Sequence, residues 1–417
     1  MKFTYLLNFF MIVNCILVVR GISVTTKYEE YKRNNLNSHK PFNRHAVTIR
    51  PGFKRFNRYQ KFLNNSFVAN GFKSQKHTKK GLNIPVYSYP FFGIYSVPME
   101  IGGQTFDIII DTMVPTFFVQ GDKCLGEFCA PPFRPSNATS FYDSGKRYDD
   151  QYYLKSGEIV ASDINISGEK AKKVFFNLID SEYGIFPGSG VIGMGHNPLQ
   201  GYPITNSTPK PIIALYKQKA IKKELFSLYL GRIPNPIRED NVTAEKSLLT
   251  LGEIDKTLYT GKLDYFSVKD KDFWEIDLDD VIINGKKLGI KGRKIILDTG
   301  FPNILMPSKD STLINKLIPE AKLLKADYML PCNTSVKVSF VIGGVEYKIK
   351  TKNLINGYYT SDAELPHDGW CMSAIYGASA DYKGPWHLGG TFLSSIYAVF
   401  DYKKSKVGIA YAAPRKK

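Results

Sequence analysis

The stretch that decides the fold is Ile295–Gly300, which reads IILDTG, an apolar run that ends in Asp-Thr-Gly. An earlier stretch, Phe106–Thr112 (FDIIIDT), is built in the same way and also ends in Asp-Thr. Each is followed later by a short apolar segment that ends in glycine, Val191–Gly193 after the first and His387–Gly389 after the second. This internal duplication predicts two related lobes that face one another.

The sequence around these motifs is typical of β-structure. From Tyr87 onward, short runs rich in Val, Ile, Tyr and Phe alternate with Gly, Pro, Asn and Asp, as in strands joined by turns. Helical periodicity is clearest in Pro211–Lys223, and a shorter segment, Ser308–Ile318, shows it too. The sequence therefore predicts an all-β protein with a few short helices, divided into an N-terminal lobe, 86–262, and a C-terminal lobe, 263–417.

The N-terminus has the layout of a secretory signal peptide. A basic Lys2 precedes a mostly apolar run from Phe3 to Val19, and small residues at its end allow cleavage after Gly21. The run approaches the length of a membrane span, so an uncleaved anchor is the alternative. We expect contact with a membrane only in that case.

Most of the positive charge lies in one segment. The formal net charge is +18, which at first points to nucleic acid or an anionic membrane as a partner. However, 25–80 holds 14 Lys and Arg against two Glu, and the residues after Lys80 carry only +4. Nucleic acid is therefore not an expected partner. Segment 22–85 is either a solvated tail or a basic pro-segment, an intramolecular inhibitor that acid releases from carboxylates in a cleft.

The cysteines and glycosylation acceptors fit the secretory pathway. Removal of Cys15 with the signal leaves an even number for an oxidising compartment: Cys124, Cys129, Cys332 and Cys371. No Cys or His spacing resembles a zinc site, so we expect neither a metal nor another cofactor. N-glycosylation acceptors begin at Asn64, Asn137, Asn165, Asn206, Asn241 and Asn333.

Together with its surroundings, IILDTG resembles the catalytic loop of the pepsin-like aspartic endopeptidases. The resemblance extends from Phe91 to Ala412 and is carried by several further segments: Leu225–Leu230, Leu249–Asp255, Phe273–Ile276, Gly389–Leu393 and Lys406–Ala410. It implies a monomeric two-lobed protease that is made as a zymogen and acts on peptides or proteins. It also implies two disulfides, Cys124–Cys129 and Cys332–Cys371.

The same resemblance assigns roles to the duplicated loops. Asp111 and Asp298 would be a catalytic pair that shares one proton, because carboxylates this close cannot both ionise. The ionised partner takes a proton from a water held between them, and that water attacks the peptide carbonyl. Thr112 and Thr299 would cross-link the two loops beneath the pair, and Gly300 would complete the second turn.

The sequence departs from the family pattern at the first loop and at the flap. Met113 stands where the family has glycine, and a bulky residue there brings strain if the backbone needs a conformation open only to glycine. Val114 and Phe301 replace hydroxyl residues that hydrogen-bond the outer carboxylate oxygens, so the dyad should keep its shared proton to higher pH. The flap tyrosine is either Tyr152 or Tyr153.

A further departure concerns the partner of that tyrosine, because Phe118 stands where the family has a tryptophan that hydrogen-bonds it.

The matches to the family and the departures from it lead to two hypotheses. The first is an active acid endopeptidase, located outside the cell or in an acidic compartment like a vacuole or lysosome. The second is a catalytically impaired pepsin-like pseudoprotease that binds peptides or a protein partner.

Overall fold

The computed structural model describes residues 82–89, 93–123, 130–150, 155–179, 188–196, 210–234, 245–270, 272–324, 327–355 and 369–415. They all belong to one compact unit. The expected signal peptide lies outside the described residues, and so does the expected pro-segment except for 82–85, which form the start of the first described strand. No helix in the described ranges has the length and apolarity to cross a membrane.

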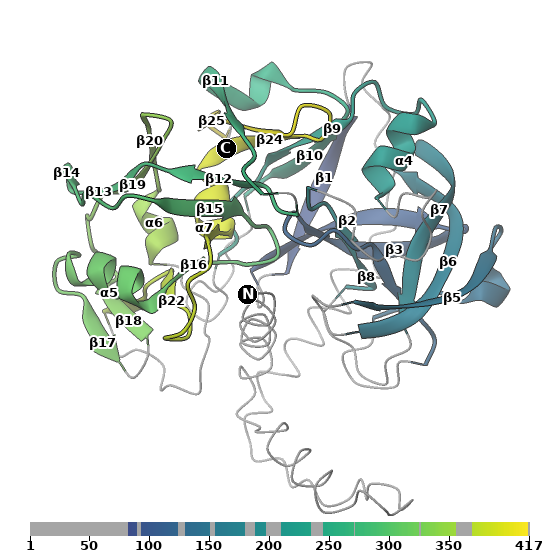
Figure 1. Cartoon of the computed structure of the whole chain (residues 1–417), viewed down its shortest axis with the longest axis horizontal. Helices are drawn as coiled ribbons and strands as arrows, with labels where there is room; N and C mark the ends of the chain where they lie inside the picture. Colours follow the sequence, from purple (N-terminus) through teal and green to yellow (C-terminus); the bar gives the residue numbers. More distant parts are fainter. Residues whose placement is uncertain are drawn as a thin grey trace, which may run out of the picture. The chain divides into compact units, whose positions relative to one another are not determined.

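Among the described residues, thirteen strands join into one sheet (Figure 1). They are β1 (Leu82–Tyr89), β2 (Ile94–Ile101), β3 (Gln104–Asp111), β4 (Phe118–Gln120), β5 (Tyr142–Asp150), β6 (Lys155–Ile166), β7 (Glu169–Ile179), β8 (Gly190–Gly193), β9 (Leu225–Tyr229), β10 (Ser247–Leu251), β11 (Tyr259–Ser267), β24 (Ile396–Asp401) and β25 (Lys406–Ala412). Their spatial order is β11-β25-β24-β9-β10-β1-β2-β3-β8-β4-β7-β6-β5. The sheet therefore unites strands from both ends of the body.

Three smaller sheets come from the second half of the chain. The five-stranded sheet runs in the order β12 (Glu275–Leu278), β15 (Arg293–Leu297), β23 (Trp386–Leu388), β16 (Ile304–Met306) and β22 (Ile375–Gly377). The other two sheets consist of β14 (Lys286–Lys287), β13 (Asp280–Ile283), β19 (Val338–Ile342) and β20 (Val345–Lys348), and of β17 (Lys322–Leu324), β18 (Asp327–Pro331) and β21 (Trp370–Met372). The predicted all-β, two-lobed fold is confirmed. The expected lobe boundary at 262/263 falls inside β11.

Helices are few and short in the described part of the chain: α4 (Pro211–Lys217), α5 (Ser308–Lys316), α6 (Thr351–Leu354) and α7 (Gly390–Leu393), with the 3-10 turns η2 (Pro135–Asn137) and η3 (Lys256–Leu258). The expected helix 211–223 is six residues too long. It ends because Lys219 takes a left-handed conformation, with φ of 63°, which terminates a helix. Ile221 is buried instead against Gly252.

The predicted duplication is present in the strand pairing. β8 runs parallel to β3 and antiparallel to β4, and β23 runs parallel to β15 and antiparallel to β16. Gly193 at the end of β8 and Gly389 directly after β23 are packed against backbone atoms of a neighbouring segment. A Cβ at Gly193 would overlap Thr116 O, and a Cβ at Gly389 would overlap Phe301 O. Both positions therefore require glycine.

The aromatic core supports the first of these segments from the other half of the chain. Trp274 is fully buried among aromatic rings, 5.3 Å from Phe400 between centroids, and its Nε1 donates to Met194 O at 2.8 Å. The Met194 amide in turn donates to Asp111 O at 2.7 Å. A residue of the second half thus fixes the backbone next to the first Asp-Thr loop.

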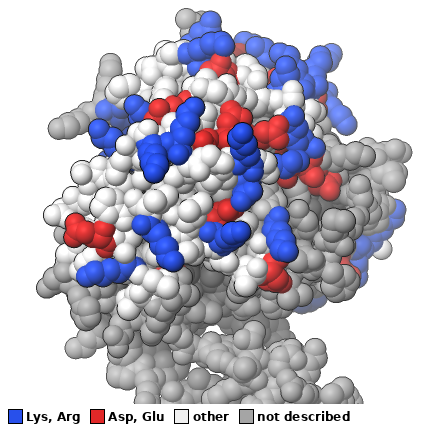
Figure 2. Space-filling view, turned by 60° about the vertical axis from the view of Figure 1, so that its left-hand side comes forward, with Lys and Arg blue, Asp and Glu red and all other residues white. Residues whose placement is uncertain are grey.

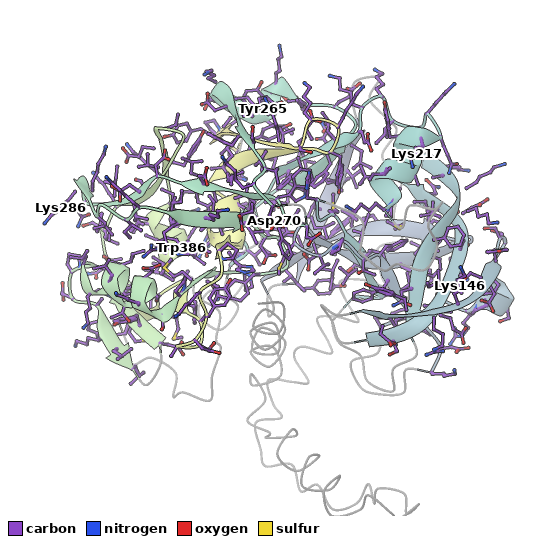
Figure 3. The ribbon with its side chains drawn as sticks, viewed as in Figure 1. Lys146, Lys217, Tyr265, Asp270, Lys286 and Trp386 are labelled. Atoms are coloured by element: carbon purple, nitrogen blue, oxygen red, sulfur yellow. A yellow bond between two sulfur atoms is a disulfide. The ribbon has the colours of Figure 1, made fainter. Side chains whose placement is uncertain are left out.

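Large apolar side chains fill the core, and many lysines lie at the surface. Trp386 is fully buried on β23, whereas Lys146, Lys217 and Lys286 are exposed and extend away from the ribbon (Figure 3). On the face shown in Figure 2, Lys and Arg side chains are interspersed with Asp and Glu. One cluster of opposite charges centres on Glu245, which pairs with Lys350, Lys352 and Arg415: the distances are 3.8, 2.7 and 3.4 Å.

The carboxyl of the half-buried Asp107 on β3 makes stability depend on pH. Burial raises the pKa of Asp107 to about 6, although a hydrogen bond from the Tyr89 hydroxyl acts to lower this pKa. The pKa of Asp107 is higher in the folded protein than in the unfolded chain. Protonated Asp107 therefore gives its full contribution to the stability of the folded state below about pH 4, and this contribution is lost as pH rises through about 6. We expect this group to lower the unfolding free energy by up to about 3 kcal/mol over this range, as urea denaturation measures it. The difference in unfolding free energy between the wild type and Asp107→Asn should therefore change by about this amount, whereas the difference for the exposed control Asp277→Asn should not; a constant difference for Asp107→Asn contradicts the assignment.

Candidate active site

The two Asp-Thr loops meet in the interior. Asp111 is the last residue of β3 and Asp298 follows β15 directly, and their exposed fractions are 3% and 2%. Thr112 and Thr299 are fully buried. The structure therefore brings together all four residues that the sequence predicted on these loops.

The two threonines cross-link the loops reciprocally. The Thr112 amide donates to Thr299 Oγ1 and the Thr299 amide donates to Thr112 Oγ1, both at 3.0 Å. Each hydroxyl then donates to the backbone of the other half, Thr112 to Leu297 O at 2.6 Å and Thr299 to Ile110 O at 2.8 Å. The expected cross-link is present, with the near-twofold symmetry that the duplication implies.

Both carboxylates accept hydrogen bonds from their own turns. Asp111 Oδ1 accepts from the amides of Met113 and Val114 at 2.8 and 3.1 Å, and Asp298 Oδ1 accepts from the Gly300 amide at 2.9 Å. A Cβ added to Gly300 would overlap Asp111 Oδ2. The carboxylate of Asp111 therefore contacts the turn that carries Asp298.

Met113 does not distort the first turn. Among the described residues, those with positive φ do not include Met113, so this position does not use the backbone freedom of glycine. The contact that matters is made by the Met113 amide, which any residue except proline provides. The side chain itself is buried, with 9% of its surface exposed.

A buried lysine holds the backbone beneath Asp111. Lys210 Nζ donates to Gly195 O at 2.7 Å, and the Gly195 amide donates to Val114 O at 2.9 Å. Burial lowers the pKa of Lys210 well below its ordinary value, although Asp272 and Glu224 oppose the shift. The sequence prediction missed this residue, because a lysine next to Pro211 reads as an ordinary helix start.

A histidine that the sequence prediction also missed contacts Asp298. His387 Nδ1 lies 2.8 Å from Asp298 Oδ2, and both side chains are buried. The other ring nitrogen, Nε2, lies 3.1 Å from the hydroxyl of Tyr382, which donates to Pro385 O at 2.6 Å. The only signal in the sequence is a polar residue between two buried apolar ones in the strand that pairs with the Asp298 loop.

Several predicted features lie outside the described residues. The flap candidates Tyr152 and Tyr153 fall in the link between β5 and β6, which pair as an antiparallel hairpin. Phe118, which stands in place of the tryptophan that hydrogen-bonds the flap tyrosine in the family and cannot donate such a bond, lies inside the described residues and is buried in β4.

The predicted cysteine pairs are partly visible. Cys124 and Cys129 also lie outside the described ranges. The Cys332–Cys371 disulfide is confirmed, with its Cα atoms 5.0 Å apart. No group of His, Cys, Asp or Glu in the described ranges could hold a metal ion.

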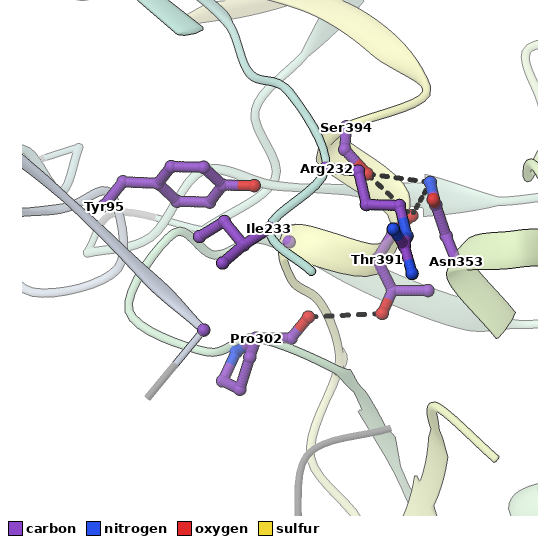
Figure 4. A pocket seen from close by; sticks show the side chains of 9 residues that line it. Tyr95, Arg232, Ile233, Pro302, Asn353, Thr391 and Ser394 are labelled. Carbon is purple, nitrogen blue, oxygen red and sulfur yellow. Dashed lines mark hydrogen bonds between the residues drawn. The ribbon is translucent and has the colours of Figure 1, made fainter. Parts of the chain in front are cut away.

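A small hollow lies beside the second loop (Figure 4). Tyr95, Arg232, Pro302 and Thr391 are among its lining residues, and its volume is about 10 Å³, enough for about one water molecule. Thr391 Oγ1 closes one side by donating to Pro302 O at 3.2 Å.

Comparison with known proteins agrees with this geometry. Residues 94–412 match the family model of the eukaryotic aspartyl proteases. The chain is 29% identical to a probable aspartic-type endopeptidase CTSD of Arthroderma benhamiae over 337 residues, which are 79% of this chain and 62% of that protein. It is 28% identical to cathepsin E-A of Xenopus laevis (78% of this chain, 80% of that protein) and 26% identical to embryonic pepsinogen of Gallus gallus (74% and 77%). The chain therefore belongs to the eukaryotic aspartyl protease family.

Proposed function

We propose that this protein is an aspartic-type endopeptidase in which Asp111 and Asp298 activate a water molecule for peptide hydrolysis. The observation that carries the proposal is the reciprocal Thr112–Thr299 cross-link, which holds both aspartates on facing loops with Asp111 against Gly300. Two carboxylates in such proximity share one proton, so that one serves as base while the other serves as acid.

The proposed reaction uses only groups of the two loops and the substrate. The ionised aspartate takes a proton from the water as the water oxygen attacks the peptide carbonyl. The protonated aspartate donates to the carbonyl oxygen, and the roles reverse when the tetrahedral intermediate expels the amine. The substrates that fit are extended peptides with apolar side chains flanking the bond.

We further propose that the protein is a zymogen of the secretory pathway, which acts outside the cell or in an acidic compartment. Segment 22–85 would serve as an intramolecular inhibitor whose basic residues pair with cleft carboxylates until acid protonates them. Deletion of 25–80 should then strengthen the binding of a statine-type inhibitor at neutral pH. Equal affinity of the two proteins would contradict an inhibitory pro-segment without affecting the proposed catalysis.

Acidification of the purified precursor tests the enzymatic proposal. We expect self-cleavage near Lys80 and digestion of a denatured protein between about pH 3 and 6, both blocked by a statine-type inhibitor and absent from Asp298→Ala. A folded sample that cleaves nothing at any pH would overturn the proposal. Retained binding of a peptide by that inactive sample would support the pseudoprotease, whose motivation is the set Met113, Val114 and Phe301.

Gly300→Ala probes the proximity of the two carboxylates. The added methyl group would overlap Asp111 Oδ2 and force the carboxylate away from the shared water. We expect kcat/KM to fall about 100-fold, because a displacement near 1 Å costs about that much, while thermal unfolding changes little. Gly261→Ala serves as the control for adding a methyl group, because a Cβ at Gly261 would meet no atom within 4 Å. Gly261 has a positive φ, so this control also carries backbone strain. Full activity of Gly300→Ala would show that Asp111 does not face this turn.

A further inference from the structure

The hydrogen bonds around His387 fix where its protons are. The single proton of the Tyr382 hydroxyl goes to Pro385 O, because a carbonyl can only accept. The contact between Tyr382 and His387 Nε2 must then be a hydrogen bond donated by the imidazole. Nε2 therefore carries a proton whatever the state of the other ring nitrogen.

One more proton lies between His387 Nδ1 and Asp298 Oδ2, 2.8 Å apart. If it is on nitrogen, an imidazolium donates to an ionised carboxylate; if it is on oxygen, a carboxylic acid donates to a neutral imidazole. Neither state alters any other hydrogen bond. In both states His387 Nδ1 holds Asp298 Oδ2 through a hydrogen bond, and a hydrogen bond to an ionised carboxylate is the stronger of the two kinds.

The position of this contact matters. Asp298 Oδ1 is already held by the Gly300 amide, so His387 acts on the second oxygen. By the family resemblance, a hydroxyl at position 301 would contact an outer carboxylate oxygen of the pair, and Phe301 supplies none. The structure contains no equivalent histidine at the first loop within the described ranges, where Asp111 Oδ1 accepts from two backbone amides.

We propose that His387 is a positioning residue that replaces the missing hydroxyl and keeps Asp298 the ionised member of the pair, so that Asp298 deprotonates the water and Asp111 carries the shared proton. The inference rests on the proposed protease function and adds an order of roles to it. The groups that face His387 are Asp298 and Tyr382, with Asp111 beyond Gly300; its register partners on β15 and β16 are the apolar Ile296 and Leu305.

Tyr382 is itself held in place. It is buried, and a Cβ on Gly384 would lie 2.6 Å from its hydroxyl oxygen. The sequence Tyr382-Lys383-Gly384-Pro385 thus provides a pre-formed acceptor for Nε2. Two contacts of His387 therefore link the three side chains. Its Nε2 donates a hydrogen bond to the Tyr382 hydroxyl, and its Nδ1 shares a proton with Asp298.

Two substitutions separate the charge of His387 from its hydrogen bond. His387→Asn keeps a neutral donor near Nδ1, whereas His387→Leu resembles the apolar neighbours of the strand and keeps none. A hydrogen-bond donor that contacts a carboxylate favours its ionised form, and both substitutions remove the imidazole that makes this contact with Asp298. We therefore expect the acid limb of the kcat/KM profile to move to higher pH by about one unit in both variants.

The two variants should differ in rate. In His387→Leu, kcat should fall about 10- to 100-fold with little change in KM, and His387→Asn should recover most of that loss. A residue that only packs would lower the melting temperature and leave the acid limb in place. An unchanged acid limb in both folded variants would overturn the inference, while wild-type cleavage would still support the protease.

A second measurement does not need activity. In protein with 15N-labelled histidine rings, the proton between His387 and Asp298 should give a resonance far downfield of the amide region. Among the six histidines, His387→Asn identifies this signal by removing it. Its loss in Asp298→Ala supports the contact, and its persistence overturns it, whether or not the wild-type protein cleaves peptides.

Discussion

Asp111→Asn is expected to abolish peptide hydrolysis as completely as Asp298→Asn, with a loss of at least about 10³-fold in kcat/KM, since a positioned acid or base contributes up to about 10⁴-fold. The sequence left Asp111 in question because of Met113, whereas the turn retains both amide donors to its carboxylate. An amide at position 111 can accept those hydrogen bonds but cannot hold the shared proton.

The measurement is the initial rate on a quenched fluorescent peptide between about pH 3 and 6. Asp277→Asn provides a matched control, because this exposed aspartate lies on β12 and pairs only with Lys269 at 3.0 Å in the described ion pairs. If Asp111→Asn retains activity within tenfold of the wild type, hydrolysis does not depend on the pair of carboxylates.

Thr112→Val is expected to lower the free energy of unfolding by about 3 kcal/mol, the largest stability effect that the site predicts. The substitution preserves shape but removes a hydroxyl that donates to Leu297 O and accepts from the Thr299 amide. Two buried backbone groups then lose their partners, at about 1 to 3 kcal/mol each. Activity should fall as well, since the loops lose part of their connection.

Urea denaturation followed by tryptophan fluorescence measures this change. Thr105→Val, an exposed position on the same strand, controls for the removal of a hydroxyl from β3. The double variant with Thr299→Val should be destabilised by less than the sum of the single effects, because each hydroxyl accepts from the amide of the other residue and both substitutions break the same cross-link. Strict additivity, or no loss in Thr112→Val, would show that the cross-link contributes little to stability.

Sequence patterns located the fold and the paired loops because the features that carry them are backbone requirements. Positions 193 and 389 require glycine because no Cβ fits there, and Gly193 and Gly389 are visible in the sequence. An apolar run before Asp-Thr likewise predicts a buried strand that ends in a polar turn. The effect of Met113 on activity stays a prediction, and the structure adds that the Met113 amide donates to Asp111 Oδ1.

The sequence could not reveal contacts that depend on three-dimensional register. His387 reads as one member of a short apolar strand, and its partner lies 89 positions away. The helix at Pro211 was extended to Lys223 because Ala220 and Ile221 continue the apolar period, although both follow the end of the helix, where Ile221 is buried and Ala220 is half-buried. In both cases, burial was inferred correctly and its geometry was not.

The thirteen-stranded sheet has a consequence for biosynthesis. β24 pairs with β9 and β25 pairs with β11, and β23 supports the loop of Asp298. A ribosome must therefore translate nearly all of the body before the edges of β9 and β11 find their partners, and such distant pairing is slow to form. A chain that ends before β23, β24 and β25 carries both aspartates but lacks the strands that support the Asp298 loop and pair with β9 and β11.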